Sequence, residues 1–116
     1  MDVTQIVERI NNLFTITSKE IYSSESGITY DADKKVKKIG YCVNLTLETI
    51  EEARIHEVDM MVTHHDAWDE IYGLREACIE KLAEYGISHY YNHLPLDDCN
   101  FGTNDSLLKK LNLEIV

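Results

Sequence analysis

Hydrophobic residues recur at helical spacing at the start of the chain. Asp2 precedes this pattern and is a competent N-cap, because its carboxylate can accept hydrogen bonds from the first amides of a helix. The pattern predicts an amphipathic helix with one face in the core. Its apolar positions are Val3, Ile6, Val7, Ile10 and Leu13.

Three more helices are predicted further along the chain. The segment "TLETIEEARIHE" has Thr46 as its N-cap and acidic residues in its first turn, where the helix dipole favours them. A later helix ends at Gly86, and the last begins near Thr103. The apolar positions of the helix before Gly86 are Ile71, Leu74, Cys78 and Leu82.

Apolar runs at residues 36–45, 58–63 and 87–92 alternate with these helices and predict strands. Residues 15–35 are rich in Ser, Thr and Asp, and we expect a loop there with a short strand around Ile28 to Tyr30. Strands that alternate with helices imply crossover connections and a parallel sheet. We therefore expect residues 1–116 to form a single small three-layer α/β domain, with a mainly parallel sheet flanked by helices.

Charge excludes some classes of partner. Eleven Lys and Arg residues stand against 21 Asp and Glu residues, so the formal net charge is −10. Such a chain repels phosphate backbones and anionic bilayers, and we expect neither direct nucleic-acid binding nor a membrane partner. The lysines of "KKVKK", residues 34–38, alternate with apolar positions and predict a solvated strand face.

Cysteine usage and the N-terminal sequence indicate a compartment. The three cysteines are widely spaced and form no C-x-x-C pair, so neither a disulfide framework nor a zinc ribbon is suggested. "MDVTQIVERI" lacks the basic start and apolar core of a signal peptide, and no apolar run approaches the ~18 residues of a membrane span. We expect a soluble cytoplasmic protein.

Histidines follow two of the predicted strands. His64 and His65 come directly after residues 58–63, and His93 and Asp97 follow residues 87–92. In a parallel sheet both positions lie at the carboxyl edge, where open α/β folds bind ligands. Neighbouring side chains of a strand point to opposite faces, so the histidine pair can converge only where the strand has ended.

These side chains offer nitrogen and carboxylate ligands without a thiolate. The set suits one or two divalent ions, of zinc, iron, manganese, cobalt or nickel. In the alternative, the histidine pair only caps a helix or lies at the surface. Asp66 is close enough to be an extra ligand, yet it could equally cap a helix or face water. His56 and His89 lack comparable placement, and we interpret both as structural.

A metal-activated water is the nucleophile that this sequence offers. It has no G-x-S-x-G elbow, P-loop or G-x-G-x-x-G motif. Binding to a metal can lower the pKa of water from about 15.7 to about 7, which would supply hydroxide near neutral pH. Either Asp66 or His93 could serve as a general base, and the sequence does not identify the catalytic residues further.

Four motifs in order resemble the N-terminal half of the Nif-three-like dinuclear metal-centre family, also called GTP cyclohydrolase type 2 homologues. They are "VNLTLETIEEA", "VDMMVTHHD", "HLPLD" and "FGTNDSLLKKLNL". The resemblance implies that His64, His65 and Asp97 are metal ligands and that His93 lines the site. It also implies a conformational role for the G-x-N-D pattern, which is formed by Gly102, Asn104 and Asp105.

The chain departs from the family pattern at several positions. Asp66 replaces a proline, Asn44 stands where aspartate is usual, and Leu94 and Pro95 replace Thr and Asn. Family members continue into a second half with a G-H-x-x-x-E motif that this sequence lacks. Two explanations are open: a fragment or short relative with a crippled site, or a homo-oligomer, a dimer or a ring, in which a second copy replaces the absent half.

Three functions are therefore open. The first is a hydrolase-like protein that uses metal-activated water on a nucleotide, another heterocycle or a phosphoester. The second is a non-catalytic metal-binding or regulatory oligomeric assembly protein, and the third is an α/β scaffold without metal. Cys99 is interpreted as a buried residue, and the nearby aromatic residues as packing rather than base-stacking residues. These aromatic residues are Trp68, Tyr72, Tyr90 and Tyr91.

Overall fold

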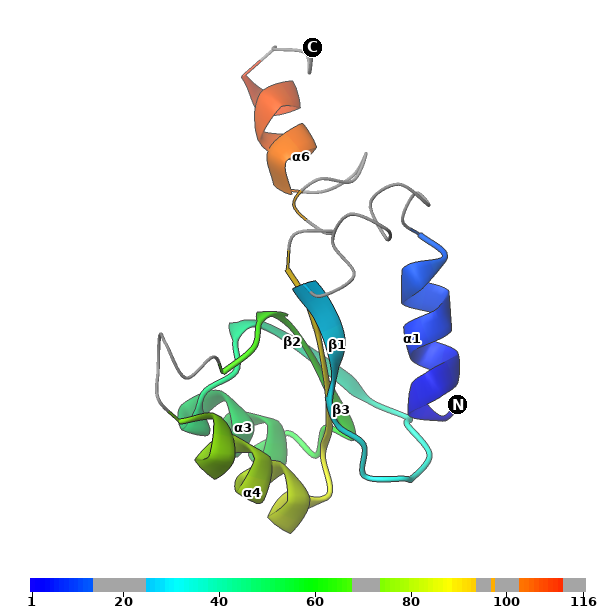
Figure 1. Cartoon of the computed structure of the whole chain (residues 1–116), viewed down its shortest axis with the longest axis vertical. Helices are drawn as coiled ribbons and strands as arrows, with labels where there is room; N and C mark the ends of the chain where they lie inside the picture. Colours follow the sequence, from blue (N-terminus) through cyan, green and yellow to red (C-terminus); the bar gives the residue numbers. More distant parts are fainter. Residues whose placement is uncertain (14–24, 68–73, 94–96, 98–102, 112–116) are drawn as a thin grey trace.

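The computed structural model describes residues 1–13, 25–67, 74–93, 97 and 103–111. Helices and strands alternate along most of this part of the chain (Figure 1). In chain order they are α1 (Val3–Asn11), β1 (Ser26–Tyr30), β2 (Ile39–Asn44), α3 (Leu47–Ile55), β3 (Met60–His65), α4 (Arg75–Tyr85), β4 (Ser88–Asn92) and α6 (Thr103–Lys110).

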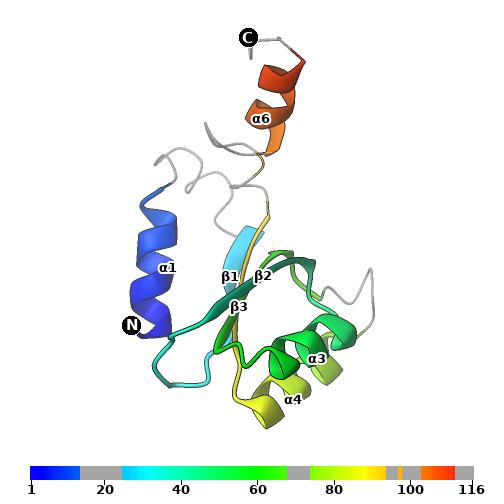
Figure 2. The ribbon, with the colours of Figure 1, turned by 180° about the vertical axis from the view of Figure 1, so that it is seen from behind.

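The four strands form one sheet in the order β1-β4-β3-β2. β2, β3 and β4 are parallel, and β1 pairs antiparallel with β4. Helix α1 lies on one face of the sheet and α3 and α4 lie on the other, as the two opposite views show (Figures 1 and 2). The predicted three-layer α/β fold with a mainly parallel sheet is confirmed.

Each face of the sheet has its own apolar cluster. Val3 and Ile6 of α1 pack with Met60 and Tyr90 on the first face. The second cluster joins α3 and α4 to the sheet, and its fully buried side chains include Ile50 and Leu82. Full burial of one such aliphatic side chain contributes about 1.5–3 kcal/mol, so these clusters hold the helices against the strands.

The helix ends follow the predicted local chemistry. The carboxylate of Asp2 accepts a hydrogen bond from the Gln5 amide at 2.9 Å, and Thr46 Oγ1 accepts one from the Thr49 amide at 3.1 Å. Gly86 ends α4 in the left-handed region, with φ at 64°. Helix α4 begins at Arg75, so Leu74, which the apolar pattern placed in the helix, is its N-cap, and Ile71 lies outside the described residues.

The lysine-rich segment 34–38 is not part of a strand, and that prediction was wrong. β2 begins at Ile39, and Val36 is buried beside α1. The amides of Lys37 and Lys38 donate to Oδ2 of Asp59 at 2.9 and 3.0 Å. Because this carboxylate accepts amide hydrogens that a ladder would use, the segment stays irregular.

The short strand expected around residues 28–30 is present as β1. Its pairing with β4 brings Ser26 opposite Asn92, and the register shifts between Ile28 and Tyr30. This antiparallel pair places the segment before β1 beside the segment after β4. In the part of the chain that is described, no helix is long and apolar enough to cross a membrane.

Candidate metal centre

His64 and His65 lie at the carboxyl end of β3. The prediction that the strand ends before them was wrong, since His65 still pairs with Asn44 of the parallel neighbour β2. The two imidazole rings are nevertheless close, with centroids 4.7 Å apart and planes at 64°. The adjacent pair therefore converges although it belongs to the strand.

His93 completes a group of three imidazoles. It directly follows β4, and its backbone amide donates to the carbonyl of Glu25 at 2.9 Å. Its ring centroid lies 4.8 Å from that of His64 and 5.0 Å from that of His65. One potential ligand atom from each of the three residues lies within 4.8 Å of the other two. We call these three residues the histidine cluster.

Asp97 reaches the histidine cluster through His64. Its Oδ1 lies 2.9 Å from Nε2 of His64, and its backbone amide donates to the His93 carbonyl at 3.3 Å. Both side chains are mostly buried. Asp97 thus lies beside the cluster rather than within it, and its role as a metal ligand stays a prediction.

Two oxygen acceptors orient the other rings. Oδ1 of Asn44 lies 2.7 Å from Nδ1 of His65, and Oε2 of Glu25 lies 3.0 Å from Nδ1 of His93. An oxygen that only accepts requires the proton on Nδ1. In a neutral ring the lone pair is then on Nε2, the form in which histidine binds a metal.

Glu25 is the residue of this site that sequence reasoning missed. It lies in the Ser-rich stretch, where neither periodicity nor a motif marks it. Only the antiparallel pairing of β1 with β4 brings Glu25 to His93.

Burial and charge favour neutral His65. Desolvation lowers the pKa of His65, and the neighbouring charges of His64 and His93 lower it further, against an opposing effect of Asp97. A metal ligand must be deprotonated, so a lowered pKa reduces competition from protons near neutral pH.

The histidine cluster fits a divalent ion by its chemistry. Three imidazoles beside a carboxylate suit zinc and the later first-row metals, whereas calcium and magnesium prefer oxygen ligands. Two nitrogens bound to one tetrahedral zinc are about 3.4 Å apart, as follows from bonds of about 2.1 Å. The present spread of up to 4.8 Å means that the rings must move inward to share one ion.

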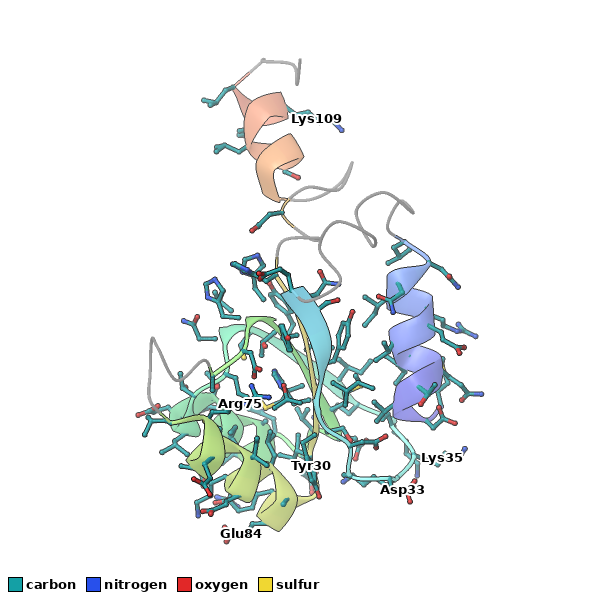
Figure 3. All side chains as sticks on the ribbon, in the orientation of Figure 1. Tyr30, Asp33, Lys35, Arg75, Glu84 and Lys109 are labelled. Carbon is teal, nitrogen blue, oxygen red and sulfur yellow. The ribbon has the colours of Figure 1, made fainter. Side chains whose placement is uncertain are left out.

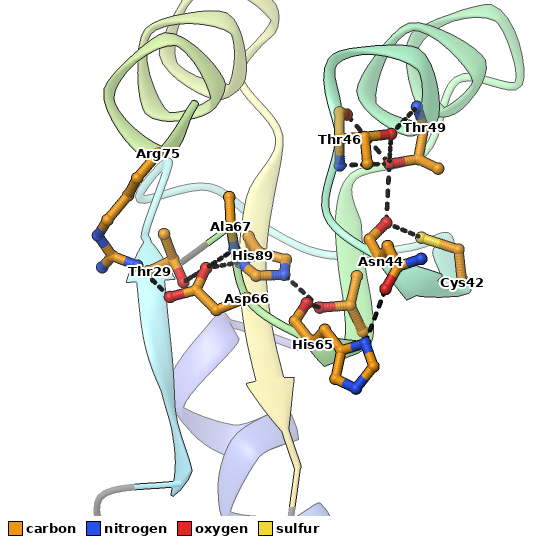
Figure 4. A network of polar contacts seen from close by, with 11 residues as sticks. Thr29, Cys42, Asn44, Thr46, Thr49, His65, Asp66, Ala67, Arg75 and His89 are labelled. Carbon is orange, nitrogen blue, oxygen red and sulfur yellow. Dashed lines mark hydrogen bonds and ion pairs between the residues drawn. The ribbon is translucent and has the colours of Figure 1, made fainter. Parts of the chain in front are cut away.

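Asp66 belongs to a second, buried network (Figure 4). Its carboxylate accepts hydrogen bonds from Thr29 Oγ1 at 3.1 Å and from the Ala67 amide at 2.9 Å. It also forms an ion pair with Arg75, the first residue of α4 (Figure 3). Asp66 is therefore not part of the histidine cluster, although we had expected a possible ligand or base there.

His89 lies in the core between Asp66 and the histidine cluster. Its Nε2 is 2.7 Å from Thr63 Oγ1, which in turn donates to the His65 carbonyl at 2.7 Å. Because the single hydroxyl proton is used, His89 Nε2 is the donor to Thr63. Burial lowers the pKa of His89 to about 4. Nδ1 of His89 lies 3.9 Å from Oδ1 of Asp66, too far for a hydrogen bond, so only the contacts through Thr63 tie His89 to the backbone of His65.

Some of the remaining predicted residues lie in the described part of the chain, and the others lie outside it. Tyr90 is buried in the core and donates its hydroxyl to Asn11, as expected of a packing residue. His56 is exposed at the end of α3. For the residue pair Asn104 and Asp105, only the helical backbone is described. The predicted residues outside the described part are Trp68, Ile71, Tyr72, Leu94, Pro95, Cys99 and Gly102.

Sequence comparison agrees with the resemblance found in the motifs. The profile of the family described as Duf34/NIF3 (NGG1p interacting factor 3) matches residues 1–116. A protein of Pyrococcus horikoshii named "GTP cyclohydrolase 1 type 2 homolog" is 34% identical over 119 residues, covering 98% of this chain and 47% of its own length. A protein of the same name from Pyrococcus abyssi is 32% identical over the same shares of both chains. The chain thus spans about half the length of these relatives.

Solved structures agree in fold. Reduced HcgD from Methanocaldococcus jannaschii superposes with a TM-score of 0.82 at 29% identity, over 98% of this chain and 48% of that one. TTHA1606 from Thermus thermophilus gives a TM-score of 0.77 at 24% identity, over 98% and 49% of the two chains. At that lower identity the likeness concerns the fold alone.

Proposed function

The chain belongs to the Duf34/NIF3 family, and on that premise we propose that it binds a divalent metal ion at His64, His65 and His93. The observation that carries the proposal is the approach of one potential ligand atom from each residue to within 4.8 Å of the other two. Asp97, already 2.9 Å from His64, is the carboxylate best placed to join them. Zinc, iron, manganese, cobalt and nickel all suit these ligands, as one or two ions.

The finer proposal is a hydrolase-like reaction. A divalent ion at this site would act as a Lewis acid and lower the pKa of a water molecule toward neutrality. The protein would contribute rings fixed by Asn44 and Glu25, and Asp97 would hold His64 in place through their contact at 2.9 Å. Because the relatives are named GTP cyclohydrolase 1 type 2 homologs, GTP is the first substrate to test, followed by other nucleotides and phosphoesters.

A non-catalytic metal-binding protein is the second candidate. Among the described residues, both carboxylates beside the histidine cluster contact a histidine: Asp97 meets His64, and Glu25 meets His93. Asp66 is occupied by Arg75 and Thr29. These contacts give the described part of the site no separate general base, which favours binding without turnover.

The direct test is metal content. The untagged full chain, His64→Ala and His93→Ala would be dialysed against each candidate ion and analysed by elemental analysis. The matched control is His56→Ala, which removes an exposed histidine from the end of α3. We expect stoichiometric metal in the parent chain and the control, and at least a tenfold lower affinity in the two cluster variants. Equal binding by all four proteins, or none by the parent chain, would refute the metal site.

Catalysis is tested separately on metal-loaded protein. GTP and the phosphoester panel would be incubated with the parent chain and with Asp97→Asn, and the products separated by chromatography. Turnover that falls in the variant supports the hydrolase. Full metal occupancy without turnover of any substrate supports the non-catalytic alternative.

A further inference from the structure

The outer strand β2 exposes a row of apolar side chains. Ile39, Tyr41 and Val43 are 49%, 62% and 53% exposed, and they alternate with less exposed neighbours. Tyr41 is paired in register with Val62 of β3, which packs against the α1 cluster. The row therefore lies on the α1 face of the sheet, beyond the part that α1 covers.

β2 also has an unprotected edge. It lies at one end of the strand order, and within the described part of the chain it pairs only with β3. A cavity of about 490 Å³ lies beside it on the other face, lined by Gly40, Cys42, Ala53 and Val58 among others. Edge strands with exposed apolar residues readily pair with another strand.

The opposite edge of the sheet differs. β1 shows one strongly exposed large apolar side chain, Ile28, at 43%. Its register shifts between Ile28 and Tyr30, and irregularities of this kind protect an edge from further pairing. Of the two edge strands, β2 is therefore the one suited to pairing with another strand.

We infer that β2 is a self-association surface, on which β2 of a second copy of this chain pairs antiparallel. A twofold axis perpendicular to the sheet at Tyr41 places Tyr41 opposite Tyr41 of the second copy. Ile39 then lies opposite Val43 of the second copy, and Val43 opposite its Ile39. Residues directly opposite in an antiparallel pair share a face, so the three apolar residues of each copy cover those of the other.

Charge favours a second copy as the occupant. Four exposed lysines, at positions 34, 35, 37 and 38, precede β2. Lys34 pairs with Asp59 and Lys38 donates to the His56 carbonyl, whereas Lys35 extends from the β1 to β2 connection (Figure 3). The exposed carboxylate of Glu48 lies in the first turn of α3, just after β2. Antiparallel pairing brings the basic end of one strand to the acidic end of the other, twice by symmetry. This local attraction opposes the repulsion between two chains that each carry a net charge of −10.

The test is sedimentation velocity of the full chain over a concentration series, with a chelator present. With metal removed, any association that is measured does not depend on the proposed metal site. We expect a monomer–dimer equilibrium that weakens roughly tenfold or more in Ile39→Lys and in Val43→Glu, since each change acts at two symmetric positions. Mixing the two variants should restore association, because the new lysine of one then faces the new glutamate of the other.

Ile28→Lys is the matched control, since it changes the same residue type to lysine on the opposite edge strand. It should leave the equilibrium unchanged, and circular dichroism would show that each variant folds. As a second readout, Tyr41→Cys should form a disulfide-linked dimer under mild oxidation, whereas Ile28→Cys and the parent chain should not. A parent chain that is monomeric throughout would overturn the inference and assign the surface to another occupant. A dimer insensitive to both β2 variants would overturn it by placing the interface elsewhere.

Discussion

Asn44 accepts a hydrogen bond from Nδ1 of His65 at 2.7 Å, across the parallel pair of β2 and β3. The Asn44 side chain thereby fixes both the ring orientation and the position of the proton. The family pattern has an aspartate here, so the neutral amide retains the acceptor without the negative charge.

Replacing Asn44 should therefore weaken metal binding. We expect Asn44→Leu to reduce metal affinity by about 10–100-fold, the usual effect of losing the partner that orients a histidine ligand. Asn44→Asp is the matched control, because it keeps the acceptor and should bind at least as tightly as the parent chain. Competition with a chromophoric chelator measures both. An unchanged affinity in Asn44→Leu would mean that Asn44 does not position His65.

Arg75 should matter for stability because its partner is buried. The side chain of Asp66 is only 2% exposed, so Arg75→Met leaves a buried carboxylate without its cation. We expect a loss of about 2–3 kcal/mol in the free energy of unfolding, less than for a fully buried pair because the Arg75 side chain is 37% exposed. Urea denaturation measures this loss.

Arg54→Met is the control for that experiment, since Arg54 and Glu51 form a far more exposed ion pair. Its stability should stay close to that of the parent chain. If both variants lose the same amount, burial of Asp66 does not determine the effect. Adding Asp66→Asn to Arg75→Met should recover part of the loss, because the buried charge is then removed.

His89 should make the fold sensitive to mild acid. Its pKa is about 4 in the folded chain, against about 6.5 when unfolded. Between these values the unfolded chain binds a proton that the folded chain does not, so stability is full above about pH 6.5 and falls as the pH drops toward 4. The loss is on the order of 3 kcal/mol. Thermal unfolding against pH should show a smaller slope for His89→Gln, and identical slopes would contradict the prediction.

Gly86 should resist substitution. Its φ of 64° lies in the left-handed region, which disfavours a Cβ atom. Gly86→Ala is expected to lower the free energy of unfolding by about 1 kcal/mol. Gly27→Ala is the control: a Cβ there would lie 3.5 Å from the Tyr91 ring, an ordinary contact, and φ is not positive. Chemical denaturation should separate the two variants.

Local patterns predicted most of the fold. The caps at Asp2 and Thr46 and the stop at Gly86 each depend on groups within a few residues, which the sequence displays directly. The order of helices and strands likewise predicted the parallel core of the sheet. The prediction of a strand over residues 34–38 was wrong because the amides of Lys37 and Lys38 donate to Asp59, more than twenty residues away.

In the candidate site too, local patterns predicted some residues, whereas others are placed by contacts with distant parts of the chain. His64, His65 and His93 were found because each lies near the end of a recognisable strand. Glu25 was not found, since its role depends on antiparallel pairing that no local pattern specifies. Asp66 was expected to cap a helix, face water or join the site, whereas distant Arg75 and Thr29 determine its place.

Each strand contributes one part of the histidine cluster or its supports. Asn44 ends β2, His64 and His65 end β3, His93 follows β4, and Glu25 precedes β1. An ion held here would therefore act as a cross-link between strand ends that are far apart in the sequence. Its binding energy would oppose fraying of all four strands together, so amide hydrogen exchange should slow across the whole sheet edge on loading.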